Sequence, residues 1–370
     1  MQRSLNPKKL QIILIGVLVT ANFVFAQKKH PEFYFYRPEI DYGSEAISNP
    51  FTIFLNGGFD ILRNGSHQNN GETNDIFKLD YRTGFSNVWD NITSPAYHIS
   101  RYGWSRFLSE EVVPTSLNRN KAQWVPNYGH HILGSGMLWV RMAEWYQFHK
   151  YPHPYFLSFL TTTAYQFLNE ALENNHSTIT NVDPIADLLI FNPLGFIVFH
   201  FEAVRRFFSQ TVRMYDWSLQ PVYNPFNRHL ENAGLQFTFN YDLNDRYALF
   251  FYYGIYGMGG ITYSLKNNRH ISLAVGTVVN RLNEHVIRHS RIITPTTDGA
   301  IGFFYDRHHS LMTSILITGP RRYNLRMNLY PGFVHWKWFR PGLFLAFGQW
   351  DGFKAGITMY SLPIGLGGQL

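Results

Sequence analysis

Three polar positions stand out because their side chains could do chemistry within apolar surroundings. His131, Glu170 and Asp187 each fall in or beside a mostly apolar run, where such residues are rarely buried without partners. A neutral histidine can accept a proton or activate a water, and a carboxylate can orient the ring, so this set suits general acid/base work. Imidazole and carboxylate groups also suit a hard or borderline metal ion. We therefore predict His131, Glu170 and Asp187 as candidate catalytic residues.

A wider group of polar residues accompanies these three positions. It comprises His130, Arg141, Glu144, Asn169, Glu173, Asp183 and Asn192. Arg141 and Glu144 are three residues apart and could pair on one helix face. The alternatives to catalysis are a buried network of ion pairs and hydrogen bonds that ties helices together, and a path for a ligand or ion. The spacing matches no recognised metal signature such as His-Glu-x-x-His, so metal binding is left open and no cofactor is predicted.

Three helices, over 127–148, 154–174 and 184–210, are predicted to position these residues. With about 100° of rotation per residue, His130, Arg141 and Glu144 share one stripe of the first helix, whereas His131 points elsewhere. His130 and His131 therefore need not share a partner. Pro193 removes a backbone donor, so it should break or kink the third helix.

Alternation of apolar with small or polar residues predicts strands on both sides of the helices. It predicts a hairpin over 50–62 and 77–86, and further strands from 233 to the end. His308 and His309 fall in a predicted turn and are expected to be exposed. About eleven strands can be counted, and bacterial single-chain barrels have even numbers, so we expect 10–12. A soluble sandwich or lipocalin-like barrel is the alternative, but its polar face usually carries many Lys and Glu, whereas here that face is mostly Gly, Ser, Thr, Asn and Gln.

The composition favours an exported membrane protein. Residues 1–26 have a basic start, an apolar middle and Ala26 at a plausible cleavage point, which predicts a secretory signal peptide. The chain has no cysteine, 17% aromatic residues and only 15% charged residues, where an ordinary soluble domain has about 25%. Aromatic belts are typical of membrane barrels. The formal net charge of +7 is not concentrated in a Lys/Arg-rich run, so no nucleic-acid partner is predicted.

These patterns predict a mixed, mainly β fold. It would be an antiparallel transmembrane β-barrel of 10–12 strands with a three-helix insert packed inside or against it. The boundaries are a signal peptide at 1–26, an N-terminal segment with the first barrel hairpin at 27–89, the helical insert at 90–230 and the C-terminal barrel strands at 231–370. Charges at the middle of a spanning helix cost about 2.5–3.5 kcal/mol each on insertion scales, which favours burial of the helices against the barrel.

The polar motif resembles an uncharacterised domain family of exported bacterial outer-membrane proteins. The resemblance is carried by about 70 residues, namely Trp124-x-x-Asn127-Tyr128-x-x-His131, Arg141, Asn169-Glu170, Glu173, and Asp183-x-x-x-Asp187-x-x-x-x-Asn192-Pro193-x-x-Gly195. Asn192 departs from the Thr that this family tends to have. The pattern also resembles small membrane proteins of the VanZ-like type. The resemblance implies an outer-membrane setting and no particular reaction.

The leading interpretation is an outer-membrane barrel with a structural, transport or assembly-related role. Its predicted partners are outer-membrane lipid and other envelope proteins. The alternative is an outer-membrane enzyme that modifies or hydrolyses acyl chains of lipid or lipopolysaccharide through the His/carboxylate site. An enzyme needs that site open to the membrane or the lumen, whereas a structural network should be sealed.

Overall fold

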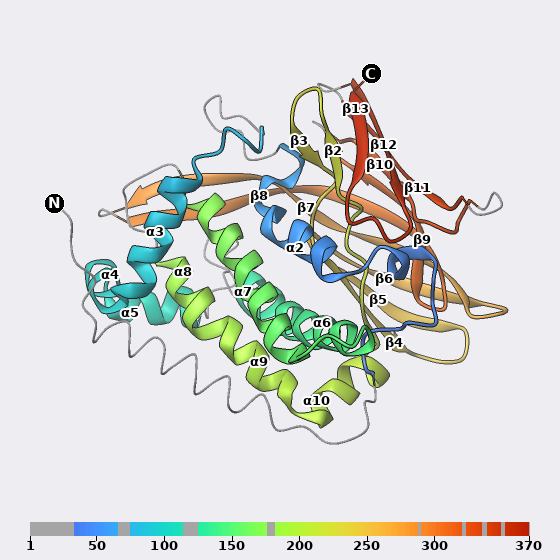
Figure 1. The fold of residues 1–370 in the computed structure, drawn as a ribbon, viewed down its shortest axis with the longest axis horizontal. Helices are drawn as coiled ribbons and strands as arrows, with labels where there is room; N and C mark the ends of the chain where they lie inside the picture. Colours follow the sequence, from blue (N-terminus) through green and yellow to red (C-terminus); the bar gives the residue numbers. More distant parts are fainter. Residues whose placement is uncertain are drawn as a thin grey trace.

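The computed structural model describes residues 33–65, 75–113, 125–175, 182–287, 290–319, 323–334, 339–348 and 352–369. The predicted signal peptide, residues 1–26, and Trp124 of the polar motif lie outside these residues. Within the described part, the fold is mixed. A large sheet lies beside a layer of helices, with α2 between the sheet and the helices α6 and α7 (Figure 1).

The sheet contains thirteen strands in the described part of the chain. They are β1 (Met214–Asp216), β2 (Val222–Asn224), β3 (His229–Glu231), β4 (Gln236–Asp242), β5 (Tyr247–Gly254), β6 (Tyr256–Leu265), β7 (Arg269–Ile287), β8 (Ser290–Arg307), β9 (Ser310–Thr318), β10 (Leu325–Leu329), β11 (Pro341–Gly348), β12 (Gly352–Met359) and β13 (Gly365–Gln369). From β4 to β13 each strand pairs antiparallel with the next. The predicted C-terminal series of strands is therefore confirmed.

The sheet is open among the described residues. β1 lies beside β4 at one end, and β13 is followed by β2, in parallel, and β3 at the other. The main chain between β1 and β2 nevertheless contacts both ends of the sheet. The N–H groups of Trp217 and Leu219 donate to the carbonyls of Gln236 and Gly234, near the β4 end. The carbonyl of Pro221 accepts from the N–H of Gly365, at the β13 end. A closed barrel is thus not what this sheet forms, although one segment bridges its two sides.

The two faces of the sheet have opposite character. On one face, Leu249, Ile261, Leu273 and Phe303 are exposed and are successive partners across β5 to β8. The other face is buried and mixes aromatic with polar side chains. Its polar members include Asn240, Thr262, Ser272, Ser314, Asn328 and Lys354. Many of these are hydrogen-bonded to one another, as between the hydroxyls of Thr262 and Ser272, 2.7 Å apart.

The space on the buried side of the sheet is filled by the chain itself. η1 (Gly43–Ala46) packs against β9. Its Ser44 hydroxyl accepts from the N–H of Leu311, and the N–H of Glu45 donates to the Ser310 hydroxyl. Trp217 and Leu219 enter the same core as the strand residues Phe250, Phe304 and Leu316, and all are almost fully buried. Burial of these large side chains stabilises the sheet, at about 1.5–3 kcal/mol for each fully buried side chain.

The predicted hairpin over 50–62 and 77–86 is wrong. These residues instead form α2 (Pro50–Gly58), η2 (Asp60–Gly65) and the start of α3 (Tyr81–Thr93). Asn49 caps α2, because its side-chain oxygen accepts from the N–H groups of Phe51 and Thr52, and Pro50 suits the first helical position. Asp80 caps α3 in the same way through Thr83. Within the predicted N-terminal unit, residues 50–62 and 81–89 therefore belong with the helical layer rather than with the sheet.

The three predicted helices are confirmed, with finer divisions. The first is η4 (Val125–Gly134) and α6 (Ser135–Phe148), the second is α7 (Pro154–Glu173), and the third is divided into α8 (Asp183–Ala186), η5 (Asp187–Phe191), α9 (Asn192–His200), α10 (Glu202–Arg206) and η6 (Phe207–Thr211). The segments α4 (Pro95–Tyr102), α5 (Trp104–Phe107) and η3 (Leu108–Val112) complete the layer. Pro193 follows the π-helical segment η5, so the irregularity that it was expected to cause lies just before it.

By length and composition, one helical stretch of the described chain, Asp183–His200, could cross a membrane. Half of that stretch is buried inside the structure, and it packs on α6 and η4. The stretch also carries two carboxyl groups, at Asp183 and Asp187. We therefore treat it as part of the helical layer.

Candidate functional site

The structure brings together His131, Glu170 and Asp187 from three helical segments, η4, α7 and η5. One ligand atom from each lies within 4.8 Å of the others. His131 Nε2 is 3.2 Å from Asp187 Oδ2, and the side chains of His131 and Asp187 are 14% and 4% exposed. Two of the three residues lie on π-helical segments, which are rare and frequently mark functional sites.

Asn192 orients the histidine ring. Its Oδ1 lies 2.9 Å from His131 Nδ1. An amide oxygen can only accept, so the Nδ1–H of His131 donates to it and Nε2 of the neutral ring carries a lone pair. That lone pair faces the Asp187 carboxyl group. Asn192 therefore sets which nitrogen of His131 is available for chemistry.

Two glycines allow the helices to approach closely enough for this contact. A Cβ at Gly195 would lie 2.8 Å from the carbonyl oxygen of Ile132 and 2.9 Å from that of His131. A Cβ at Gly136 would lie 2.8 Å from the carbonyl oxygen of Gly195. These oxygens are main-chain atoms that cannot swing away, so the α9 backbone reaches the chain around His131 only because both positions lack a side chain.

The electrostatics of the site are dominated by buried acids. Burial and the neighbouring carboxylates raise the pKa of Glu170 and of Asp187 well above the ordinary values. The charges that act most strongly on Asp187 are all carboxylates: Asp183, Glu170, Glu111 and Glu173. A side-chain contact with Asp187 acts on the pKa of Glu170 in the opposite direction, but it is outweighed by burial and by the charges of Glu173 and Asp183. Burial lowers the pKa of His131 to about 4, so its ring is neutral at pH 7.

Glu111 and Asp183 extend this acidic cluster towards α4 and η3. Burial raises the pKa of Glu111 to about 7, and Glu111 shares a hydrogen bond with Asp183. The hydroxyl of Tyr102 donates to Glu110 at 2.7 Å and lies 3.3 Å from Glu111. Arg106 pairs with Glu110 at 2.7 Å rather than with the inner acids. Asp183 and Glu173, predicted as network residues, thus surround the site.

Two other predicted network residues lie away from His131. His130 faces Asp60, with Nε2 3.7 Å from Oδ2, so the two histidines have different partners, as their positions on the helix allow. Asn169 donates to the carbonyl oxygen of Gly57 at 3.0 Å and so ties α7 to α2.

The predicted pairing of Arg141 with Glu144 is wrong, because both side chains are used by distant parts of the chain. Arg141 Nη2 lies 2.6 Å from Glu45 Oε2, and its Nη1 donates to the carbonyl oxygen of Phe35 at 2.7 Å. Glu144 instead accepts from the backbone N–H groups of Tyr34, Phe35 and Tyr36, at 2.7, 2.9 and 2.8 Å. Both residues therefore hold the N-terminal segment against α6.

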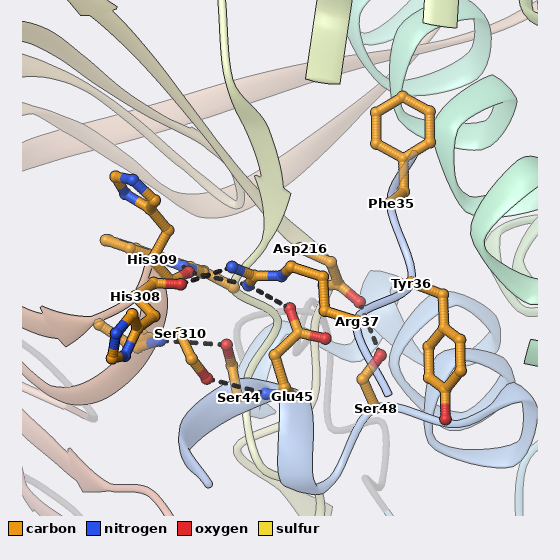
Figure 2. Close-up of polar contacts among 12 residues, drawn as sticks. Phe35, Tyr36, Arg37, Ser44, Glu45, Ser48, Asp216, His308, His309 and Ser310 are labelled. Carbon is orange, nitrogen blue, oxygen red and sulfur yellow. Dashed lines mark hydrogen bonds and ion pairs between the residues drawn. The ribbon is translucent and has the colours of Figure 1, made fainter. Parts of the chain in front are cut away.

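Arg37 joins this network to the sheet. Its Nη2 lies 2.5 Å from Glu45 Oε1, and its guanidinium donates to the main-chain carbonyls of His308 and His309, as Figure 2 shows. His309 is not exposed as predicted. Its ring stacks between those of Tyr215 and His270, with centroids 4.9 and 4.4 Å away.

The sequence did not single out Glu45, Asp216 or Asp306. Asp306 accepts from the N–H of His309 at 2.9 Å and pairs with His270 at 2.7 Å. The one available signal was the pair of adjacent histidines, 308 and 309, in a chain with few charges. The rings that stack on His309, those of Tyr215 and His270, lie on β1 and β7 and are distant in sequence, so no local pattern could identify them.

Comparisons of the chain with protein-family models, with curated proteins and with solved structures find no match.

Proposed function

We propose that the chain is an integral outer-membrane protein whose sheet presents one face to lipid, with a structural or assembly-related role. The observation that carries the proposal is the apolar character of the exposed face of the sheet. Exposed apolar residues continue across the strands in register, whereas Ser, Thr, Asn and Lys side chains lie on the buried face among aromatic ones. A water-soluble sheet has the opposite arrangement, with its apolar face buried and its polar face outside.

A second apolar row supports this proposal. It runs beside the first, through Phe251, Val275, Ile301, Ile317 and Phe347, each between 42% and 60% exposed. Monomeric soluble proteins rarely expose continuous apolar patches of more than a few hundred Å². Contact with acyl chains explains a surface of this kind without a cost for exposing it to water.

Aromatic residues lie towards one end of the same face. Tyr247 and Tyr263 are cross-strand partners near the β4–β5 and β6–β7 turns, with ring centroids 5.3 Å apart, and both are exposed. Tyrosines at this level fit the aromatic belt at a membrane interface. β5 and β6 have 8 and 10 residues, close to the 9–11 tilted residues that cross a bilayer.

The filled interior favours a structural or assembly role over that of a diffusion pore. The N-terminal segment, Trp217 and Leu219 occupy the buried side of the sheet. A water-filled channel would need that volume. The segment between β1 and β2, which bonds to both sides of the sheet, would close the structure towards a barrel in the membrane.

The alternative, a lipid-modifying enzyme, is favoured by the 3.2 Å contact of His131 with Asp187. The geometry weakens it, because the His131 side chain is only 14% exposed and its Nε2 already faces the buried Asp187 carboxyl group. A general base must reach the proton that it removes, within about 2.6–3.2 Å or through one water. A sealed carboxyl pair is better suited to holding helices together.

Membrane fractionation of cells that express the full chain tests the proposal. The protein should be recovered in the outer-membrane fraction and should migrate differently on gels before and after heating, as a folded membrane sheet does. Recovery as a soluble periplasmic protein, or in the inner membrane, would refute it. Mass spectrometry of outer-membrane lipids from the same cells, compared with cells expressing His131→Gln, tests the enzyme alternative. A lipid change that requires His131 would replace the structural role with a catalytic one.

A further inference from the structure

We propose that His131, Glu170 and Asp187 form a binding site for one divalent transition-metal cation such as Zn²⁺ or Mn²⁺, which ties η4, α7 and η5 together. The inference does not depend on where the protein resides. It starts from the spacing of the three side chains. One oxygen or nitrogen atom of each lies within 4.8 Å of the other two. Tetrahedral ligands bonded at about 2.0–2.1 Å to one zinc ion lie roughly 3.4 Å apart, so side-chain shifts of about 1 Å would complete the coordination.

The orientation of His131 fits metal binding. A histidine that binds a metal through one nitrogen almost always donates its other N–H to a carbonyl, carboxylate or water, which fixes the ring. In this protein, Nδ1–H of His131 donates to Asn192 Oδ1 at 2.9 Å. Its Nε2 lone pair then faces Asp187 Oδ2 at 3.2 Å. The ring is therefore already held as it would be in a metal complex.

The contact is electron-rich when Asp187 is ionised. The Nε2 lone pair and the Asp187 carboxylate then repel each other, and the Glu170 carboxylate adds a third electron-rich group. A proton can relieve one of these contacts. A divalent cation relieves all three at once and also offsets the negative charges of Glu111 and Asp183, which lie close to the site.

Two buried oxygen atoms give an independent indication. Glu170 Oε2 and Asp187 Oδ1 have almost no exposed surface and accept no hydrogen bond from the described residues. Buried polar atoms are normally satisfied, and a group left without a partner calls for an explanation such as an ion. Both atoms belong to the proposed ligands, and a bound cation would satisfy them.

The ligand types indicate the class of ion. One imidazole with carboxylates suits Zn²⁺, Mn²⁺ or Fe²⁺, whereas Ca²⁺ and Mg²⁺ prefer oxygen ligands throughout. Cysteine is missing from the sequence, so the thiolate sites that select soft ions cannot form. We therefore expect Zn²⁺ and Mn²⁺ to bind more tightly than Ca²⁺.

The experiment uses the full chain, folded in detergent micelles and freed of metal with a chelator. Binding of Zn²⁺, Mn²⁺ and Ca²⁺ is measured by titration calorimetry, and retained metal is counted by mass spectrometry after dialysis. We expect about one equivalent of Zn²⁺ or Mn²⁺. Glu170→Gln and His131→Gln should abolish retention, whereas Asn192→Ala, which keeps every ligand, should weaken affinity by about 10–100-fold.

Two matched controls make the result specific. His130→Gln removes the neighbouring histidine, whose partner is Asp60, and should leave binding unchanged. His270→Gln tests the other group with metal-ligand spacing, His270, Asp306 and His309, and should also leave it unchanged. Absence of binding to the folded wild-type chain, equal binding by Asn192→Ala and wild type, or loss of binding in His270→Gln would each overturn the proposal. Asn192→Ala keeps the test decisive even if the ligand variants fail to fold.

Discussion

Replacement of Arg141 by leucine should destabilise the helical layer strongly. The Arg141 guanidinium is buried with 2% of its side chain exposed, and it lies 2.6 Å from Glu45, whose side chain is 1% exposed. It also donates to the carbonyl oxygen of Phe35 at 2.7 Å and to Ser48 Oγ at 3.0 Å. The substitution leaves these acceptors without their donor in a site closed to water.

The magnitude follows from what remains after the substitution. Removing one partner of a buried ion pair costs about 3–5 kcal/mol, because the other charge stays buried. Arg37 still lies 2.5 Å from Glu45, so the loss should fall near the lower limit, at about 3 kcal/mol. Burial alone would raise the pKa of Glu45, but Arg141 and Arg37 outweigh it and lower the pKa. Arg141→Leu should therefore move this pKa upward.

The assay is denaturant unfolding of the full chain in detergent, followed by tryptophan fluorescence and by protease sensitivity of residues 125–211. Arg206→Leu is the matched control, because Arg206 pairs with Glu202 on the surface, with side chains 43% and 60% exposed. It should cost about 0–1 kcal/mol. An equally small decrease in the free energy of unfolding for Arg141→Leu would refute the view that the Arg141–Glu45 ion pair holds the N-terminal segment in place.

Three further predictions follow from the same structure. Gly195→Ala should destabilise the chain by about 1–3 kcal/mol, because its Cβ would meet two carbonyl oxygens, whereas Gly257→Ala, with open space around it, should be nearly silent in the same unfolding assay. With divalent metals chelated, the free energy of unfolding should fall as pH rises from about 6.5 to 8. The folded state binds more protons than the unfolded state in this range, because the pKa values of four buried acids are raised, namely Glu170, Asp187, Glu111 and Glu144. The lowered pKa of His131 acts in the opposite direction only below about 6.5, so a stability that rises above that pH would contradict the argument. Leu273→Arg, on the exposed face of β7, should hinder folding into lipid vesicles by about 2–4 kcal/mol, and unchanged folding yields would contradict a lipid-facing position.

The parts of the fold that depend on periodicity could be predicted from the sequence. Strands such as β5, β10 and β12 alternate between buried and more exposed residues, and the helices over 135–148 and 154–173 carry long apolar stripes. The strand prediction for residues 50–62 was wrong because Phe51, Ile53 and Leu55 alternate over too few residues to distinguish a strand from a helix. The Asn49-Pro50 start signal was the better indicator there, since it satisfies helix N–H groups directly.

The candidate site was predictable in composition and only partly in geometry. His131, Glu170 and Asp187 were grouped from their types, and the structure places them together; their catalytic role stays a prediction. The partner of Arg141 could not be found, because Glu45 is separated from it by 96 residues and spacing along one helix indicates only local pairs. The role of Gly195 likewise depends on how closely two helices approach each other.

The most direct test of the lipid-facing sheet uses site-directed spin labels, which the absence of native cysteine makes straightforward. A label at Leu273→Cys would sit on the exposed face of β7, and one at Asn268→Cys would sit in the β6–β7 turn. In lipid vesicles, the label at 273 should be accessible to oxygen and shielded from a water-soluble nickel chelate, whereas the label at 268 should be accessible to the chelate. Equal accessibility of both labels to the chelate would contradict the account, because it would place the apolar face of the sheet in water.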